Sequence, residues 1–332
     1  MSAKAADVAR LAGVSVSTVS LVLNGNGRIS AKTIEQVRAA AAQLNYVPNA
    51  QASGLRRRIT HRIALVVPDI GNSVYVSIAK SIQQVAKAKG YYVSLVSTDG
   101  IEGADIDALQ LLHGGQVDGM VLISLKSSRA LEQGLKHLQK PICVIGRVPG
   151  NLGVDNVQAN SDQGVRLAVE HLLGLGRRRL VFINGPLDTN PAVQRLEGYR
   201  QSIRAAGLEE RLVTAEFTLE GGYAAAEEAL NSYPNADALV CANDLLGIGA
   251  LKWLRQRKIR VPEDIAVSGM DDIRECEICS PALTSVALHA AERGRMAAQM
   301  LFDRLSGAST GSPIRVVLEP TLRVRESTGG QP

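Results

Sequence analysis

Aromatic side chains are scarce in this chain, which has one Trp, seven Tyr and three Phe among its 332 residues, so each of them needs a specific reason for its presence. No run is long and apolar enough to span a bilayer. The opening residues, MSAKAADVAR, lack the apolar core of a signal peptide. The sequence therefore predicts a cytoplasmic protein with no membrane partner.

The usual sequence signatures of catalysis are also missing. The chain has no P-loop, no GxSxG, no complete GxGxxG and no HExxH, and its five histidines are scattered. Cys276 and Cys279 form a CxxC, but neither a second such pair nor a nearby His pair accompanies it. The four cysteines fit free thiols in a reducing compartment. We therefore expect no enzymatic activity, no metal site and no cofactor.

Positive charge is concentrated at the N-terminus. Residues 1–60, called the head below, carry eight basic and two acidic side chains, a net charge of +6. The whole chain is +5, so the remaining 272 residues, called the body, sum to −1. A basic head on a near-neutral body suggests a polyanionic partner for the head alone. A solvated bundle of helices would carry the same charge, so both interpretations stay open on this observation.

Residues 3–45 predict three short helices. The first carries an apolar side, the second runs from about Val16 to Asn24, and Ser30 caps the third. Gly13 permits the first turn and Ser15 can cap the second helix. Two short helices joined by a tight, Gly-containing turn form a helix-turn-helix. The expected apolar positions are Val8, Ala9, Leu11, Ala12, Val19, Val22, Leu23, Ile34, Val37, Ala41 and Leu44.

The pattern changes at Arg62, where apolar strand-like runs begin to alternate with amphipathic helices. This alternation predicts parallel sheets in an α/β fold. Segments 61–158 and 159–287 form two similar units, and a late helix and late strands return to them. We expect a two-lobed clamshell with a hinge. The runs that carry this pattern include RIALVVPD, YYVSLVST, GMVLIS, PICVIG, RLVFING, ALVCAND and IAVSGMDD.

The second predicted helix has a composition suited to DNA. The second helix of a helix-turn-helix enters the major groove, and its early residues reach base edges. Ser17, Thr18 and Ser20 can donate hydrogen bonds to phosphate oxygens without the bulk of a long side chain. An ordinary helical bundle with a serine-rich face is the rival interpretation. The coincidence of turn, cap, hydroxyls and basic charge favours DNA.

Long stretches of the chain resemble the lactose-repressor/galactose-repressor (LacI/GalR) family. They include DVARLAGVSVSTVSLVLNG, NYVPNAQASGLR, GPLDTNPAVQRLEGYR, CANDLLGIGAL, VPEDIAVSGMDD and SPALTSV, and the match runs nearly end to end. The resemblance implies a homodimeric, DNA-binding transcription regulator whose body is similar to periplasmic sugar-binding proteins and closes around a small effector. The given sequence ends with RVRESTGGQP, without the extra helix of the tetrameric lactose repressor, so a dimer is expected.

The expected organisation has three parts. Residues 1–48 form the helix-turn-helix domain, 49–61 the hinge, and 62–332 the effector-binding and dimerisation body. The first lobe of the body comprises 62–158 with 288–317, and the second comprises 159–287 with 318–327.

The resemblance also assigns DNA contacts. Family members usually have Arg directly after TVS, where it is expected to reach a guanine edge; here that position is Leu21, which can instead touch a thymine methyl group. Leu21 and LNGNGRIS resemble the maltose-regulon repressor subgroup. Val16 and Ser17 occupy the other base-reading positions. The expected DNA contacts of the head helices are Val16, Ser17, Thr18, Ser20, Leu21 and Asn24.

A hinge helix is implied for Asn49–Arg56. In the family this stretch folds on operator DNA, and a Leu from each subunit wedges into the minor groove, where such wedges kink the duplex. Leu55 matches the wedge, Ala52 matches a hinge contact, and Asn49 is a further expected DNA contact. A plain linker role for Leu55 is the rival interpretation.

The family pattern places six effector contacts in the cleft. Arg and Asn can donate to a polyhydroxylated ligand, Asp can accept from paired hydroxyls, and an aromatic ring can pack on a sugar's C–H face. Phe217 could instead be a core residue, Asp271 could cap the next helix, and Tyr75 and Arg147 could be structural. The expected contacts are Tyr75, Arg147, Arg195, Phe217, Asn243 and Asp271.

These features predict a sequence-specific repressor of a carbohydrate-utilisation operon that a sugar or sugar derivative releases from its operator. A regulator that needs a purine or another small molecule as corepressor would share the fold, although Thr189 and Pro191 stand where purine-responsive members have an Arg and a Thr. A sugar-binding transport protein would share the body, but the basic head and the missing signal peptide disfavour it. An α/β enzyme is disfavoured by the missing catalytic motifs.

Overall fold

The computed structural model describes residues 3–23, 29–46, 59–126, 128–149 and 152–330. The chain divides into two compact units, Met1–Thr60 and His61–Pro332, which correspond to the head and the body. Among the described residues, no single helix has the length and apolar character needed to cross a bilayer. Only the first two helices taken together reach that length and composition, across a 101° bend.

The head contains the three expected helices, α1 (Ala5–Ala12), α2 (Val16–Leu23) and α3 (Ala31–Gln43). Gly13, with a φ of 65°, ends α1 in the left-handed conformation that glycine adopts without strain. Ser15 and Ser30 cap the next two helices, because their Oγ atoms accept the backbone N–H groups of Thr18 at 3.1 Å and Thr33 at 3.2 Å. The buried core is formed by Val8, Ala9, Val19, Val22, Val37, Ala40 and Ala41.

Two details of the head differ from the sequence expectation or fall beyond the structure. Leu11, expected on the apolar side of the first helix, is 48% exposed. An eight-residue helix that meets two partners along one side buries only a narrow stripe, here Val8 and Ala9. Asn24, the expected end of the second helix, lies outside the described residues.

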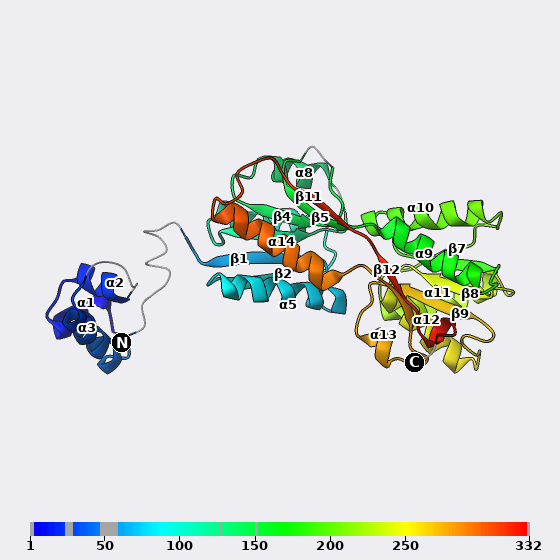
Figure 1. Cartoon of the computed structure of the whole chain (residues 1–332), viewed down its shortest axis with the longest axis horizontal. Helices are drawn as coiled ribbons and strands as arrows, with labels where there is room; N and C mark the ends of the chain where they lie inside the picture. Colours follow the sequence, from blue (N-terminus) through cyan, green and yellow to red (C-terminus); the bar gives the residue numbers. More distant parts are fainter. Residues whose placement is uncertain (1–2, 24–28, 47–58, 127, 150–151, 331–332) are drawn as a thin grey trace. The chain divides into compact units, whose positions relative to one another are not determined.

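The body contains two six-stranded sheets, one in each lobe (Figure 1). The first lobe has the strand order β11-β5-β4-β3-β1-β2, with all neighbours parallel. Its strands are β1 (Arg62–Val67), β2 (Tyr92–Ser97), β3 (Gly119–Ile123), β4 (Ile142–Ile145), β5 (Asp155–Ala159) and β11 (Arg315–Leu318). Its helices are α5 (Ser73–Ala88), α6 (Ala104–Ala108), α7 (Gln110–His113), α8 (Arg129–Lys136) and α14 (Ala290–Leu305).

The second lobe has the order β12-β10-β9-β8-β6-β7. Its strands are β6 (Leu180–Asn184), β7 (Leu212–Thr214), β8 (Ala238–Cys241), β9 (Ala266–Met270), β10 (Thr284–Ala287) and β12 (Thr321–Arg323). Its helices are α9 (Ser161–Gly174), α10 (Asn190–Ala205), α11 (Leu219–Ser232), α12 (Asp244–Gln256), α13 (Glu275–Ile278) and the 3-10 turn η1 (Glu326–Thr328).

The second sheet is not wholly parallel, in contrast to the prediction. The edge strand β12 pairs with β10 in the antiparallel direction. A parallel neighbour needs a long crossover within its own sheet, whereas β12 enters directly from β11 of the other lobe. Large parallel sheets commonly accept one antiparallel strand at an edge.

The chain passes between the lobes three times. The passages lie between β5 and α9, between β10 and α14, and between β11 and β12, and the last two are orange to red in Figure 1. Helix α14 therefore returns to the first lobe, where it packs on α5 and on β3, β4 and β5. Within the described part of the chain, these three passages connect the lobes, and the expected opening and closing about them remains a prediction.

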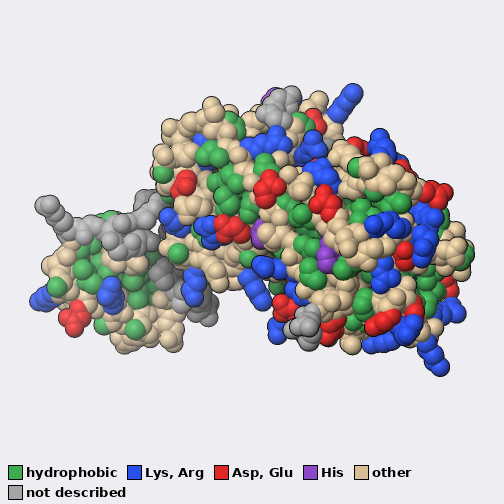
Figure 2. All heavy atoms as spheres, turned by 45° about the vertical axis from the view of Figure 1, so that its right-hand side comes forward, with side chains coloured by type: hydrophobic (Ala, Val, Ile, Leu, Met, Phe, Trp, Pro, Cys, Tyr) green, Lys and Arg blue, Asp and Glu red, His purple; other side chains and the backbone are tan. Residues whose placement is uncertain are grey.

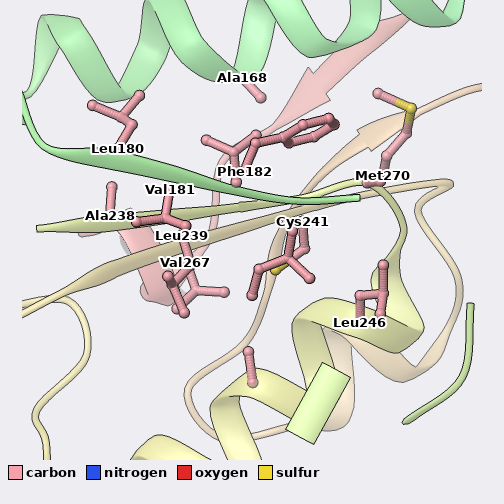
Figure 3. Close-up of a cluster of buried hydrophobic side chains, with 14 of the residues drawn as sticks. Ala168, Leu180, Val181, Phe182, Ala238, Leu239, Cys241, Leu246, Val267 and Met270 are labelled. Carbon is pink, nitrogen blue, oxygen red and sulfur yellow. The ribbon is translucent and has the colours of Figure 1, made fainter. Parts of the chain in front are cut away.

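The central strands of the second lobe, β6, β8 and β9, are buried along their whole length because helices cover both faces of the sheet. Figure 3 shows Val181, Phe182, Leu239 and Val267 of the central strands in this core, with Ala168 of α9 nearby. Each strand of a sheet covered on both faces is a continuous hydrophobic run. This rigid sheet positions the loops at its carboxyl edge.

Candidate functional site

Helix α2 presents an exposed face made of small and apolar side chains. Val16 is 48% exposed and Leu21 44% exposed, and Ser17 and Ser20 are also exposed. Val19 and Val22 point into the head core, so the four exposed residues share the opposite side of the helix. A face without acids and without long side chains can approach the floor of a DNA groove closely.

The hydroxyl groups gather at the start of α2. Ser15 Oγ lies 2.6 Å from Ser17 Oγ and 2.8 Å from Thr18 Oγ1. Thr18 is half-buried, so the structure places it at the edge of the exposed face. Backbone N–H groups and hydroxyls at a helix start favour phosphate oxygens. The remaining expected DNA contacts, Asn24, Asn49, Ala52 and Leu55, lie outside the described residues.

A cavity of about 510 Å³ lies between the two lobes of the body. Its walls come from loops at the carboxyl ends of strands and from helix starts, which is where open α/β sheets bind ligands. The structure brings all six sequence-predicted effector residues to this cavity, and their roles there remain a prediction. They are Tyr75, Arg147, Arg195, Phe217, Asn243 and Asp271.

Arg195 and Asp271 form a buried ion pair in the cavity wall. Arg195 Nη2 lies 3.4 Å from Asp271 Oδ1, and Arg195 Nη1 donates to the Ala242 carbonyl at 2.7 Å. Their side chains are 8% and 10% exposed. Burial raises the pKa of Asp271, and the nearby guanidinium groups of Arg195 and Arg293 partly offset this rise. The pair therefore combines a fixed donor fork with an acceptor.

Asp271 does not cap the next helix, because α13 begins only at Glu275. Its backbone has a φ of 111°, which side-chain-bearing residues rarely adopt. Such conformations cluster at functional sites, because the surrounding structure must hold them.

The Phe217 ring lies directly over the backbone at Gly185, the residue that follows β6. A Cβ atom at Gly185 would overlap the ring, so only glycine allows this approach. The Arg195 guanidinium lies 5.8 Å from the ring centroid. Phe217 is half-buried and thus presents apolar surface beside hydrogen-bond donors, an arrangement that suits a sugar.

The other three predicted residues differ in their surroundings. Asn243 caps α12, since its Oδ1 accepts the Leu246 N–H at 2.9 Å, a structural role that sequence reasoning did not include. Burial raises the pKa of the Tyr75 hydroxyl, with a further rise from Asp271. Arg147 is exposed.

Sequence reasoning missed several cavity residues. Lys126 Nζ and Asp188 Oδ2 form an ion pair of 2.5 Å between the lobes, and the Asn190 N–H donates to the Leu125 carbonyl at 2.7 Å. Arg293 of α14 also lines the cavity. No spacing pattern could identify these residues, because each interaction joins elements that are distant in sequence.

The CxxC pair is structural in character. All four cysteines are free thiols, and burial raises the pKa of both Cys276 and Cys279. Within the described part of the chain, no three or more His, Cys, Asp or Glu side chains are grouped so that they could hold a metal ion.

Asp244, the residue after Asn243, has a buried carboxyl group whose pKa is raised. Its Oδ1 accepts from Ser285 Oγ at 2.6 Å and its Oδ2 from the Ile273 N–H at 2.9 Å. Burial, with a smaller effect of Asp271, raises the pKa of Asp244 to about 7. The carboxyl therefore binds its proton more tightly in the folded body than in the unfolded chain, where its pKa is about 3.9.

Because the folded body binds this proton more tightly than the unfolded chain does, we expect the body to become less stable as pH rises. The contribution of Asp244 to the free energy of unfolding is fully present below about pH 4 and is lost as pH rises through the folded pKa of about 7. The change is on the order of 1 kcal/mol per pH unit. Asp244→Asn, which can still accept from Ile273 and donate to Ser285, should flatten this slope in urea unfolding at pH 5 to 8. Glu220→Gln, at an exposed site on α11, is the control; equal slopes in all three proteins would refute the assignment.

Comparison with known proteins assigns the head and the body to families of known proteins. Residues 5–49 match the family profile described as "Bacterial regulatory proteins, lacI family", and residues 169–328 match a "Periplasmic binding protein-like domain". The chain belongs to the lacI family of bacterial regulatory proteins. The fold predicted from the sequence, a helix-turn-helix head with a two-lobed α/β body, is confirmed.

Relatives match over nearly the whole chain. The HTH-type transcriptional regulator CelR of Thermobifida fusca is 39% identical over 331 residues, covering 96% of both chains. The ribose operon repressor of Escherichia coli K12 is 34% identical over 327 residues, covering 97% of this chain and 98% of the relative.

Solved structures match equally widely. A CelR–cellobiose complex superimposes with a TM-score of 0.74 at 36% identity and covers 98% of this chain and 99% of the other. A Lac repressor dimer bound to operator and the anti-inducer ONPF superimposes with a TM-score of 0.87 at 26% identity and covers 99% of each chain.

Proposed function

We propose that this protein is a cytoplasmic, homodimeric repressor of a carbohydrate-utilisation operon and that a sugar or sugar derivative releases it from its operator. The observation that carries the proposal is the interlobe cavity, where a donor fork, an acceptor and an aromatic face meet on a body attached to a DNA-binding head. Relatives named for cellobiose binding, ribose regulation and operator binding support it.

We propose three parts with separate tasks. Residues 1–48 read the operator through Val16, Ser17, Thr18, Ser20, Leu21 and Asn24. Residues 49–61 form the hinge, where Leu55 wedges into the minor groove, Ala52 makes a hinge contact and Asn49 is a further DNA contact. Residues 62–332 bind the effector and dimerise, with lobes of 62–158 with 288–317 and 159–287 with 318–327.

The signal would pass through lobe closure. An effector that contacts both lobes favours the closed body, and closure shifts how the first lobes pair across the dimer. The hinge segments Asn49–Arg56 are attached to the first lobes and move with them. Their two copies would then no longer meet at the operator centre. Coupling of this kind amounts to about 1–3 kcal/mol and must be reciprocal, so operator weakens effector binding by the same factor.

The test begins with operator selection from randomised duplexes and thermal-shift screening against sugars. Fluorescence anisotropy then measures operator affinity with and without each sugar that binds. Release by a sugar supports repression by an inducible regulator. Tighter operator binding with ligand would instead identify a corepressor-dependent regulator.

Leu21 should set operator preference, because its side chain is exposed on the side of α2 opposite the head core, and the proposal turns that side toward the bases. Leu21→Arg should shift the selected half-sites toward guanine at one position, with a preference of about 1–3 kcal/mol from a bidentate contact. Selection from one randomised library with both proteins is the measurement. Arg10, 79% exposed on α1, offers the control Arg10→Ala, which should leave the consensus unchanged. Identical consensus sequences for wild type and Leu21→Arg would show that residue 21 does not face the bases.

A further inference from the structure

The buried end of the cavity carries more positive than negative charge. Four residues interact electrostatically there: Tyr75, Arg195, Asp271 and Arg293, called the inner cluster below. Arg195 and Asp271 form the ion pair described above. Arg293 adds a second guanidinium, and arginine stays protonated in proteins. With a neutral Tyr75, two guanidinium groups face one carboxylate.

The Arg293 side chain has no partner of its own in the described part of the chain. Its Nε is buried without a hydrogen bond, and no ion pair joins its guanidinium to any described carboxylate. Arg195 Nε is likewise buried and unpartnered. The Arg293 side chain as a whole is half-buried and lines the cavity, so an anion that enters the cavity can reach its guanidinium group.

The packing of two helices of the first lobe places Arg293 at the cavity wall. It lies in the first turn of α14, beside Gly294, where a Cβ atom would overlap Ser81 Oγ and the Ile78 backbone of α5. The two helices therefore touch through their backbones, one turn from Tyr75. This contact fixes the backbone of Arg293 relative to α5, so its side chain starts from a set point beside the cavity.

The other acids of the cavity wall lie outside the inner cluster, and of these only Asp69 contributes to the raised pKa of Tyr75, as the smallest cause. All four are exposed, and three have other partners: Asp188 pairs with Lys126, Asp69 accepts the Gly71 N–H at 2.7 Å, and Asp99 accepts from Ser97. Glu216 is exposed on the loop before α11. The excess charge of the buried end is thus left for a ligand to balance.

We propose that the effector is a sugar acid whose carboxylate binds between Arg293 and Arg195 while its hydroxyls meet Asp271 and Phe217. The proposal rests on the sugar-responsive function above and narrows its ligand class. A carboxylate carries one charge and two acceptor oxygens, which match the excess charge and the two guanidinium groups that line the cavity. A phosphate ester carries nearly two charges and would overcompensate. The carboxylate also joins one arginine from each lobe, so it would favour closure.

Matched ligand pairs test this in the full-length protein. Thermal shift and calorimetry measure the affinity for each neutral sugar and its acid: glucose and glucuronate, galactose and galacturonate, cellobiose and cellobionate. Glucose 6-phosphate tests whether a phosphate group is preferred to a carboxylate. We expect at least one acid to bind at least tenfold more tightly than its neutral counterpart and to release operator. In Arg293→Met the affinity for that acid should fall at least tenfold, and the preference over the neutral sugar should vanish. Arg293→Lys should keep part of the preference.

The melting temperature without ligand separates the proposed role of Arg293 from a purely structural one. Removal of a charge that makes no ion pair or hydrogen bond in the described part of the chain should leave the melting temperature without ligand unchanged or higher in Arg293→Met, whereas loss of a structural contact would lower it. Arg204→Met, at an exposed site on α10, is the control and should match wild type throughout.

Several outcomes would overturn the proposal. If neutral sugars bind and release operator while no acid binds better, sugar-responsive repression stands and the sugar-acid inference fails. If glucose 6-phosphate is preferred, or if Arg293→Met keeps its preference for acids, the carboxylate assignment fails. If no sugar of either kind binds, the proposed effector class fails and the inference with it.

Discussion

Arg195→Ala is expected to abolish the response to effector while operator binding in the absence of ligand persists. Arg195 provides the buried donor fork of the cavity and holds Asp271 through the 3.4 Å pair. Truncation of one partner in a buried, hydrogen-bonded charge pair costs about 2–5 kcal/mol, so effector affinity should fall roughly 30-fold or more. Operator affinity by anisotropy, with and without the effector, is the measurement.

The same substitution should also weaken the body. It leaves Asp271 and the Ala242 carbonyl without their donor, and removal of one member of a buried pair costs about 3–5 kcal/mol. The assay must therefore be run well below the melting temperature of the variant. Arg195→Lys keeps the charge but not the fork, and should fold well yet respond weakly. Arg204→Ala on the exposed side of α10 should behave as wild type. A normal response of Arg195→Ala would show that Arg195 is not the effector anchor.

Removal of the head should eliminate DNA binding altogether. A chain that begins at Arg62 retains both sheets and the cavity, which belong to a separate compact unit. It carries a net charge near zero, and Figure 2 shows basic and acidic side chains interspersed over the visible face of the body. Specific operator complexes have dissociation constants of about 10⁻⁸–10⁻¹¹ M, and without the head the dissociation constant should therefore rise by about three orders of magnitude or more.

Salt dependence gives an independent check on the same assignment. Operator binding by the full-length protein should weaken steeply with salt, because the basic head releases condensed counterions from the duplex. The shortened chain should still dimerise and still be stabilised by the effector, which controls for its folding. Undiminished DNA binding by that chain would refute the role of the head.

The elements of the head were accessible from sequence because they depend on local interactions. Gly13 ends α1 and Ser15 caps α2 through contacts that span only a few residues. The alternation of apolar runs with amphipathic segments likewise predicted the α/β body, because both faces of a covered sheet must be apolar. The effector residues were predicted by resemblance to a family; no pattern alone joins Arg195 to Asp271 across 76 positions.

Tertiary structure alone decided which residues line the cavity and how the last strand pairs. Arg293 stands in an amphipathic helix, where an arginine ordinarily points to solvent, and the close packing of Gly294 against α5 places this part of the helix at the cavity. Phe217 became a cavity wall because Gly185 lets the ring lie on its backbone. The direction of β12 followed from its entry out of the other lobe. Each result depends on contacts between segments far apart in the chain, and such contacts are set by the packing of whole elements rather than by the order of neighbouring residues.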